Sequence, residues 1–352
     1  MTIAALARPE IRALEPYTSA EQLDNTIRLN ANELPWANCD DRFRRPLNRY
    51  PEIRPAKLRN LLAENFGCKP DNLVVTRGSS EGIDLLVRVF CRAGQDSIAT
   101  TSPTFLMYRH YAEVQGARLI EFTTTRDQDF AVDIDALIAE CDESTRLIFL
   151  CSPNNPTGNV IPRNDLLDLL ESRANKSVVA IDEAYIEFAQ QPSIVELLDQ
   201  YENLVVLRTL SKARAYAGAR CGCVIAAPAV IRMLDAVQAP YALATPVIEC
   251  VENAMLAGKT DVDGWIEDVV TERARLIEAI REFSFVRRIW PSSANFFLIE
   301  VDNVSALLDR TAGDGILLRD FAGDLANCIR ITVGSAAEND RLLQSLGKLR
   351  DS

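Results

Sequence analysis

From residue 71 onward, the sequence alternates short apolar runs with longer segments whose apolar residues recur at helical spacing. Seven runs are dominated by Val, Ile and Leu and are bounded by polar or glycine-containing segments, as buried strands are: residues 72–76, 96–100, 117–122, 146–151, 177–182, 204–209 and 221–227. Apolar strands separated by helices form mostly parallel sheets whose two faces are both covered. The sequence therefore predicts an α/β fold whose large domain is built on a mostly parallel, seven-stranded sheet.

The two ends of the chain have a different pattern. Residues 240–282 are mostly helical in periodicity, and four strand-like runs alternate with helical segments after them, at residues 285–290, 295–300, 315–320 and 327–334. This alternation predicts a small α+β domain at the C-terminus. We expect an irregular N-terminal arm over residues 1–45 that packs with the small domain, a large domain over 46–255 and the small C-terminal domain over 256–352.

Charge and composition exclude several classes of function. A net charge of −12 argues against nucleic acid or an anionic membrane surface as a partner. With a single histidine, His110, and nine cysteines that lack metal-ligand spacing, we expect neither a metal site nor a Ser-His-Asp triad. The scattered cysteines, an N-terminus without a signal-peptide pattern and the lack of an apolar run of about 18 residues predict a cytoplasmic protein.

Polar residues follow the predicted strands at the edge of the sheet where open α/β folds bind their ligands. Ser79 and Ser80 lie in "RGSSEG", a turn of small residues that leads from the first strand into a helix. Backbone amides and hydroxyls at such a helix start suit a phosphate, although an ordinary capped helix would contain the same residues. The loop "SPNNPTG" at residues 152–158 follows another strand, and its two prolines hold the asparagine side chains in a fixed place.

Two further strands end in residues that can do chemistry. Asp182 ends one apolar run, with Tyr185 three residues later, and a buried carboxylate there is costly unless it is paired. Lys212 follows the next apolar run directly after Ser211, and Arg220 comes eight residues later. Lys212 is either a solvated loop lysine or a nucleophilic amine that forms a Schiff base.

Taken together, these residues are the partners that pyridoxal 5'-phosphate (PLP) requires. A lysine binds its aldehyde, and a carboxylate keeps its ring nitrogen protonated and electron-withdrawing. Asn or Tyr binds its phenolic oxygen, while a helix start, hydroxyls and an arginine bind its phosphate. The sequence therefore predicts a PLP site along one edge of the sheet.

The same residues lie in stretches that resemble a known family. These stretches are "LNANELP", "NRYP", "GSSEGIDLLVRVF", "CSPNNPTG", "DEAYIEF", "LRTLSKARAYAGARCG", "ILLRD" and "IRITVG", in the order and spacing of the family. The chain resembles the PLP-dependent aminotransferases of class I and II, and it is most similar to histidinol-phosphate aminotransferases over nearly its whole length. The resemblance implies the PLP-dependent transferase fold type I.

The resemblance also implies roles for individual residues. Lys212 would bind the cofactor covalently and move the proton between substrate and cofactor, with Asp182 and Tyr185 as the other catalytic residues. The cofactor-binding residues would be Ser79, Ser80, Phe105, Asn155, Asp182, Tyr185, Ser211, Lys212 and Arg220, and Tyr50 would reach the phosphate of the other subunit's cofactor. The substrate-binding residues would be Tyr17, Asn32, Arg319 and Arg330.

The family implies a homodimer with shared active sites and small-molecule substrates. The expected reaction is transamination between L-histidinol phosphate and 2-oxoglutarate in L-histidine biosynthesis, which gives imidazole acetol phosphate and L-glutamate. An aromatic or other amino-acid aminotransferase and a threonine-phosphate decarboxylase are alternatives on the same scaffold. A PLP-sensing regulator would need an attached DNA-binding domain, against which the length and the charge of the chain argue.

Three positions depart from the family pattern. Phe105 stands where relatives often carry Tyr, so a hydroxyl contact is lost while ring stacking is retained. Ser80 stands where relatives commonly carry an acidic or amide residue. Arg214 stands where relatives are more apolar, and we expect it to be a solvated helix residue; facing the pocket, it would alter substrate choice.

Overall fold

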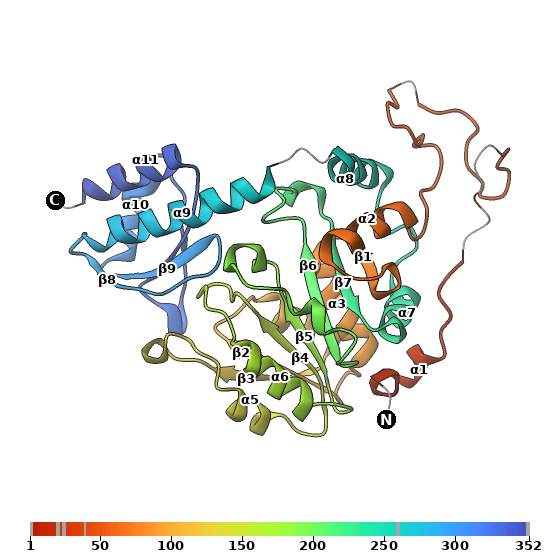
Figure 1. Cartoon of the computed structure of the whole chain (residues 1–352), viewed down its shortest axis with the longest axis horizontal. Helices are drawn as coiled ribbons and strands as arrows, with labels where there is room; N and C mark the ends of the chain where they lie inside the picture. The colour runs from red at the N-terminus through yellow and green to blue at the C-terminus, as the bar shows by residue number, and fades with distance from the viewer. Residues whose placement is uncertain (1–2, 19–21, 23–25, 39, 258–260, 350–352) are drawn as a thin grey trace.

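A computed structural model describes residues 3–18, 22, 26–38, 40–257 and 261–349 (Figure 1). Its large sheet has the order β1-β7-β6-β5-β4-β2-β3. The strands are β1 (Leu73–Thr76), β2 (Ser97–Ser102), β3 (Arg118–Thr123), β4 (Thr145–Cys151), β5 (Val178–Asp182), β6 (Leu204–Thr209) and β7 (Gly222–Ala226). Neighbouring strands from β3 to β6 pair in parallel, and β7 is antiparallel to both β1 and β6. The predicted mostly parallel, seven-stranded sheet is confirmed.

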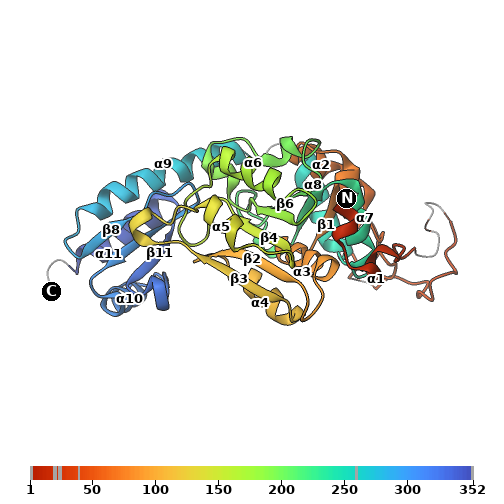
Figure 2. The same cartoon turned by 90° about the horizontal axis from the view of Figure 1, so that it is seen from below.

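Helices cover both faces of this sheet (Figure 2). One face packs against α2 (Ala56–Phe66), α5 (Ile134–Glu140), α6 (Arg163–Ser172) and α8 (Thr245–Ala257). The other packs against α3 (Ser79–Phe90), α4 (Met107–Gln115) and α7 (Pro228–Val237). Every residue of β1, β5, β6 and β7 is buried, because each face of these strands lies under a helix. Hence these strands are mostly apolar and do not alternate in polarity.

The small domain is an antiparallel sheet of order β10-β11-β9-β8 with three helices. Its elements are α9 (Val262–Arg281), β8 (Val286–Ile289), β9 (Phe296–Val301), α10 (Val304–Gly313), β10 (Arg319–Asp320), β11 (Cys328–Thr332) and α11 (Ala336–Gly347). The strand expected over 315–320 is therefore shorter than predicted. Gly315 has a left-handed φ of 77° and Leu317 is 88% exposed, although Ile316 and Leu318 pack against the core of the small domain.

Short 3-10 helices connect several of these elements. They are η1 (Ile3–Leu6), η2 (Pro70–Asn72), η3 (Arg126–Gln128), η4 (Ile186–Ala189), η5 (Ile194–Leu197), η6 (Ala217–Ala219) and η7 (Gly323–Leu325). None of the helices in the described ranges combines the length and the apolar character that crossing a lipid bilayer requires.

The N-terminal arm contacts the large domain. Ile3 and Leu6 of η1 and Ile11 of α1 (Pro9–Arg12) are buried in the same apolar cluster as residues of α3 and α7. Beyond α1, the chain runs outward at the end of the molecule opposite the small domain (Figure 1). Within a single chain, the apolar residues at the start of the arm are buried against α3 and α7, and packing of the arm with the small domain stays a prediction.

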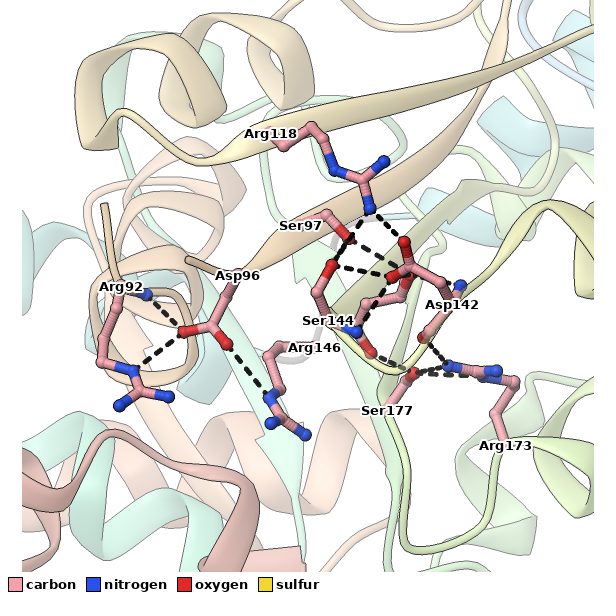
Figure 3. Close-up of polar contacts among 10 residues, drawn as sticks. Arg92, Asp96, Ser97, Arg118, Asp142, Ser144, Arg146, Arg173 and Ser177 are labelled. Carbon is pink, nitrogen blue, oxygen red and sulfur yellow. Dashed lines mark hydrogen bonds and ion pairs between the residues drawn. The ribbon is translucent and has the colours of Figure 1, made fainter. Parts of the chain in front are cut away.

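A polar network ties together the amino ends of β2, β4 and β5 (Figure 3). Asp96 is 4% exposed and accepts hydrogen bonds from the backbone and side chain of Arg92 and from Arg146. Beside it, Arg173 donates to Ser177, whose hydroxyl donates to the backbone of β4 at 2.6 Å. The network lies at the end of the strands opposite the edge where the predicted site residues lie, so it serves the fold.

We predict that Asp96→Ala lowers the free energy of unfolding by about 2 kcal/mol, because it leaves buried donors without an acceptor. Asp199→Ala provides the control, since Asp199 pairs with Lys69 at the surface, with 78% and 74% of the side chains exposed. That change should cost less than about 1 kcal/mol. Urea unfolding measures both values, and equal losses would contradict the structural role of Asp96.

Candidate active site

A cavity of about 600 Å³ opens at the carboxyl ends of β4, β5 and β6. Of the residues predicted to form the site, the structure brings the following to its wall: Ser79, Ser80, Phe105, Asn155, Asp182, Tyr185, Ser211, Lys212, Arg220, Arg319 and Arg330. Of these residues, Arg319 and Arg330 come from the small domain. The cavity thus lies between the two sheets, and its polar groups come from segments far apart in sequence.

One end of the cavity is an anion site. Helix α3 begins at Ser79, so its free backbone amides lie beside the hydroxyls of Ser79 and Ser80. Gly78 precedes it with φ of 73°, and a Cβ there would lie 2.6 Å from Nη2 of Arg220. Arg220 Nη1 donates to Ser211 Oγ at 3.3 Å. A helix start, three hydroxyls and a guanidinium group are the donors that a phosphate needs.

Asp182 is buried, and the groups around it only partly offset the cost of burying its charge. It ends β5, is 2% exposed and accepts hydrogen bonds from Ala184 N at 3.1 Å and from Tyr108 Oη at 2.9 Å. Burial raises the pKa of Asp182 to about 6, although the Tyr108 bond, the Ala184 amide and the charge of Lys212 lower it. A protonated ring nitrogen in the cavity would give this carboxylate a charged partner.

Lys212 projects its amine into the same cavity. Its Nζ lies 5.3 Å from the centre of the Tyr185 ring. Burial lowers the pKa of Lys212, and the positive charges of Arg330 and Arg220 lower it further, against the opposing effect of Asp182. A lowered pKa increases the neutral fraction of the amine, which is the nucleophilic and basic form.

Two arginines lie directly opposite each other on the small-domain side of the cavity. Arg319 of β10 and Arg330 of β11 are cross-strand partners, an arrangement that is unfavourable for like charges. Arg330 Nη1 donates to Asn155 Oδ1 at 2.5 Å, and its buried Nε has no partner within the described chain. Burial lowers the pKa of Arg330, and Arg319 adds to this effect. An anion between the two guanidinium groups would relieve the repulsion.

Three predicted site residues lie away from the cavity of their own chain. Tyr17 and Tyr50 are 53% and 50% exposed, and Asn32 is also exposed. The Tyr50 ring stacks on Tyr241 with 4.7 Å between centroids. Arg214 is half-buried in the turn after β6 and does not line the cavity.

Three residues at the site were not predicted from the sequence: Tyr108, which bonds to Asp182, and Cys151 and Thr209 in the cavity wall. Thr209 Oγ1 donates to Ser211 Oγ at 2.9 Å and so helps to orient that hydroxyl. The sequence spacing could have indicated Tyr108. It follows Phe105 by three residues, and residues at this spacing lie on one side of a helical turn.

Comparison with known proteins identifies the family. Residues 25–346 match the family model "Aminotransferase class I and II". The chain belongs to this family. A "Histidinol-phosphate aminotransferase" of Pectobacterium carotovorum is 40% identical over 352 residues, covering 99% of this chain and 98% of that protein.

Solved structures share the fold. The histidinol-phosphate aminotransferase from Sinorhizobium meliloti in complex with pyridoxal-5'-phosphate matches with a TM-score of 0.78 at 24% identity, covering 87% of this chain and 83% of that one. The L-threonine-O-3-phosphate decarboxylase from Porphyromonas gingivalis matches with a TM-score of 0.72 at 22% identity, covering 87% and 92%. A fold shared by both proteins leaves the choice of reaction to the residues of the site.

This aminotransferase is PLP-dependent, and the cavity fits the cofactor. The anion site suits its phosphate, the buried carboxylate of Asp182 suits its ring nitrogen, and the amine of Lys212 suits its aldehyde. Among the residues that the structure describes, each of these groups is incompletely partnered, which is the state expected of a site built for a ligand.

We predict that Asp182→Asn makes the cofactor-free protein more stable relative to the wild type, and that this difference grows as the pH rises. The pKa of Asp182 is about 6 in the folded state against an ordinary 3.8, so the folded protein loses stability as pH rises through this window and the buried carboxyl ionises. The amide does not ionise. Between about pH 4 and about pH 8, the difference in unfolding free energy between variant and wild type should grow in favour of the variant by about 2 kcal/mol. Thermal unfolding at several pH values measures it, and a pH-independent difference would contradict the buried charge.

Proposed function

We propose that this chain transfers an amino group between L-histidinol phosphate and 2-oxoglutarate, giving imidazole acetol phosphate and L-glutamate, in L-histidine biosynthesis. The observation that carries the proposal is the cross-strand pair of Arg319 and Arg330 beside Lys212. Two adjacent guanidinium groups can bind the side-chain carboxylate of glutamate in one half-reaction and the phosphate of histidinol phosphate in the other. The curated relative that is 40% identical carries the corresponding name.

We propose the following positions for the cofactor. Ser79, Ser80, Ser211 and Arg220 bind its phosphate, Phe105 stacks on its ring, Asp182 binds the ring nitrogen, and Asn155 and Tyr185 bind the phenolic oxygen. Asn155 Nδ2 already donates to Tyr185 Oη at 3.4 Å, so these two groups lie together. When bound, PLP withdraws electrons from the substrate Cα and makes its proton acidic.

Lys212 then moves the proton. Its amine lies in the cavity, and its lowered pKa increases the neutral form that accepts a proton from Cα. Burial raises the pKa of Tyr185, so its hydroxyl stays protonated and can donate a hydrogen bond. Arg330 keeps one buried nitrogen, Nε, available for the substrate anion. These residues therefore bind, orient and deprotonate the substrate.

An aromatic or other amino-acid aminotransferase is the second candidate, because Arg330 would also bind the α-carboxylate of an ordinary amino acid. Cavity-lining Phe105, Leu106 and Phe321 offer an apolar surface for an aromatic side chain. A threonine-phosphate decarboxylase would use the same anion-binding arginines. Loss of CO₂ in place of a proton would distinguish the decarboxylase from the aminotransferases, and the preferred amine donor distinguishes the two aminotransferases.

We further propose that the chain is a homodimer in which Tyr50 reaches the cofactor phosphate of the partner, with Tyr17 and Asn32 beside the substrate. Large apolar side chains of the arm are exposed, among them Leu29 at 89% and Trp36 at 78%. A surface of this kind favours association with another chain. Two-fold symmetry makes the exchange reciprocal, so one interface completes two sites.

The arm has a rigid element that supports this proposal. Only 3% of the Glu33 side chain is exposed, although its neighbours are open to solvent. It accepts hydrogen bonds from Tyr50 N at 2.7 Å, from Arg49 at 2.9 Å and from Arg28 at 2.7 Å. Burial raises the pKa of Glu33, but these three donors outweigh it and hold the pKa below its usual value. Glu33 thereby fixes Tyr50 beside Asn32 before any partner binds.

We also propose a cytoplasmic location and the division into domains at 46–255 and 256–352. Eight cysteines of the described chain are free thiols, which a reducing compartment preserves. The boundary falls within the last turn of α8 and before the long helix α9 that leads into the second sheet.

One experiment tests the proposed substrate. Mixing the PLP-loaded enzyme with single amine donors, without any acceptor, should change the cofactor absorbance fastest for L-histidinol phosphate among histidinol phosphate, phenylalanine and threonine phosphate. A faster change with phenylalanine would move the assignment to an aromatic aminotransferase. Release of CO₂ from threonine phosphate would move it to a decarboxylase.

We predict that Arg330→Ala slows both half-reactions, each by roughly 10- to 100-fold, because one anion site serves both substrates. Arg287→Ala is the control, since Arg287 lies in β8 of the same domain with 61% of its side chain exposed. Single-turnover rates with histidinol phosphate and with glutamate measure the effect. Loss with only one of the two substrates would refute the shared anion site.

We predict that mixing inactive Lys212→Ala subunits with Tyr50→Phe subunits restores activity at limiting cofactor. Each mixed dimer has one intact site, so an equal mixture should recover roughly a quarter of wild-type sites. The control pairs Lys212→Ala with Asp182→Asn; both lesions then affect a subunit's own site, and mixing should restore nothing. Recovery in neither mixture, or full activity in a proven monomer, would remove the shared-site proposal.

A further inference from the structure

Tyr108 is a fully buried residue of α4 that has no place among the residues assigned so far. Its hydroxyl donates to Asp182 Oδ2 at 2.9 Å, across 74 positions of sequence. Its ring stacks on Phe149 of β4, with centroids 5.1 Å apart and 5° between the planes. The edge of the Phe105 ring meets it at 5.8 Å and 85°. Tyr108 therefore touches both the carboxylate and the aromatic ring that face the cavity.

The aromatic contacts fix the hydroxyl of Tyr108. Phe149 is also fully buried and belongs to a central strand, so the stacked pair has no space to rotate. Phe105 lies three residues earlier and lines the cavity wall. Because the ring is held from two sides, its oxygen stays at one place relative to the end of β5.

The surroundings of Asp182 show what this bond does. The titratable groups around it are Tyr108 from α4, Cys151 from β4, Tyr185 from the turn after β5 and Lys212 from the loop after β6. The backbone amide of Ala184 also donates to it. Burial raises the pKa of Cys151, so its thiol stays neutral. Hydrogen bonds to Asp182 come from Tyr108 on one oxygen and from Ala184 on the other. Among side chains, Tyr108 thus opposes the penalty of ionising this buried carboxyl most strongly, and the charge of Lys212 adds to its effect.

We propose that Tyr108 is a positioning residue that holds the Asp182 carboxylate ionised and oriented toward the ring nitrogen of PLP. Through Phe105, the same residue also sets the position of the ring that stacks on the cofactor. This role rests on PLP as the cofactor and is independent of which amine is the substrate. Tyr108 touches neither substrate nor cofactor itself, because Asp182 and Phe105 lie between it and the cavity.

Tyr108→Phe removes only the hydroxyl and keeps the stacked ring. Tyr111→Phe is the matched control, because Tyr111 lies on the same helix with its hydroxyl near Asp84 and Arg88, away from Asp182. Cofactor affinity is measured by titrating the cofactor-free protein with PLP. Tyr108→Phe should weaken binding about 10-fold, and Tyr111→Phe should change it less than about 2-fold.

A double-mutant cycle separates positioning from general stability. In an Asp182→Asn background, Tyr108→Phe should change PLP affinity less than about 2-fold, because no ionised carboxylate is left to hold. The loss should therefore depend on Asp182. An equal loss in both backgrounds would overturn the proposal, as it would show that the hydroxyl acts without the carboxylate.

The cofactor-free protein gives an independent readout. Removing a donor from an ionised Asp182 destabilises the fold only where the carboxyl is charged, so the drop in melting temperature caused by Tyr108→Phe should be larger near pH 8 than near pH 4. The drop should be the same at both pH values in the Asp182→Asn background and for Tyr111→Phe. A pH-independent drop for Tyr108→Phe alone would overturn the role of Tyr108 and leave PLP binding at Asp182 in place.

Discussion

The parallel pairing of β2, β4, β5 and β6 is the constraint on which the rest of the site depends. Parallel strands end at one edge, so residues that follow them meet there even when long helices separate them in sequence. Asp182 and Lys212 are brought together in this way from adjacent strands β5 and β6. The antiparallel β7 returns the chain between β1 and β6, which places Arg220 beside the start of α3.

The cavity is strongly cationic in a chain whose net charge is −12. Lys212, Arg220, Arg319 and Arg330 line it, against the single carboxylate of Asp182. Such an excess of one sign inside a partly buried space is unfavourable without a ligand, and it draws anions from solution. The cationic interior therefore suits the binding of small phosphates and carboxylates, even though the chain as a whole is acidic.

Patterns of short range were sufficient to predict much of this arrangement. The apolar runs gave the strands, and Asp182, Lys212 and Arg220 were recognisable because each ends or follows one of them. The bond from Tyr108 to Asp182 was not predictable, since it depends on how α4 packs over β4 and β5. The pattern also does not say which apolar face the first turns of the arm cover, and in the structure they are buried against α3 and α7.

The burial of Asp182 links cofactor binding to the folding stability and the lifetime of the protein. A folded chain that carries an ionised carboxylate with incomplete partners is less stable than its apolar surroundings would allow. A ligand that pairs with Asp182 in the folded chain but not in the unfolded chain shifts the folding equilibrium toward the folded state by mass action. The supply of the cofactor would then influence how long each molecule survives degradation, as well as how fast it works.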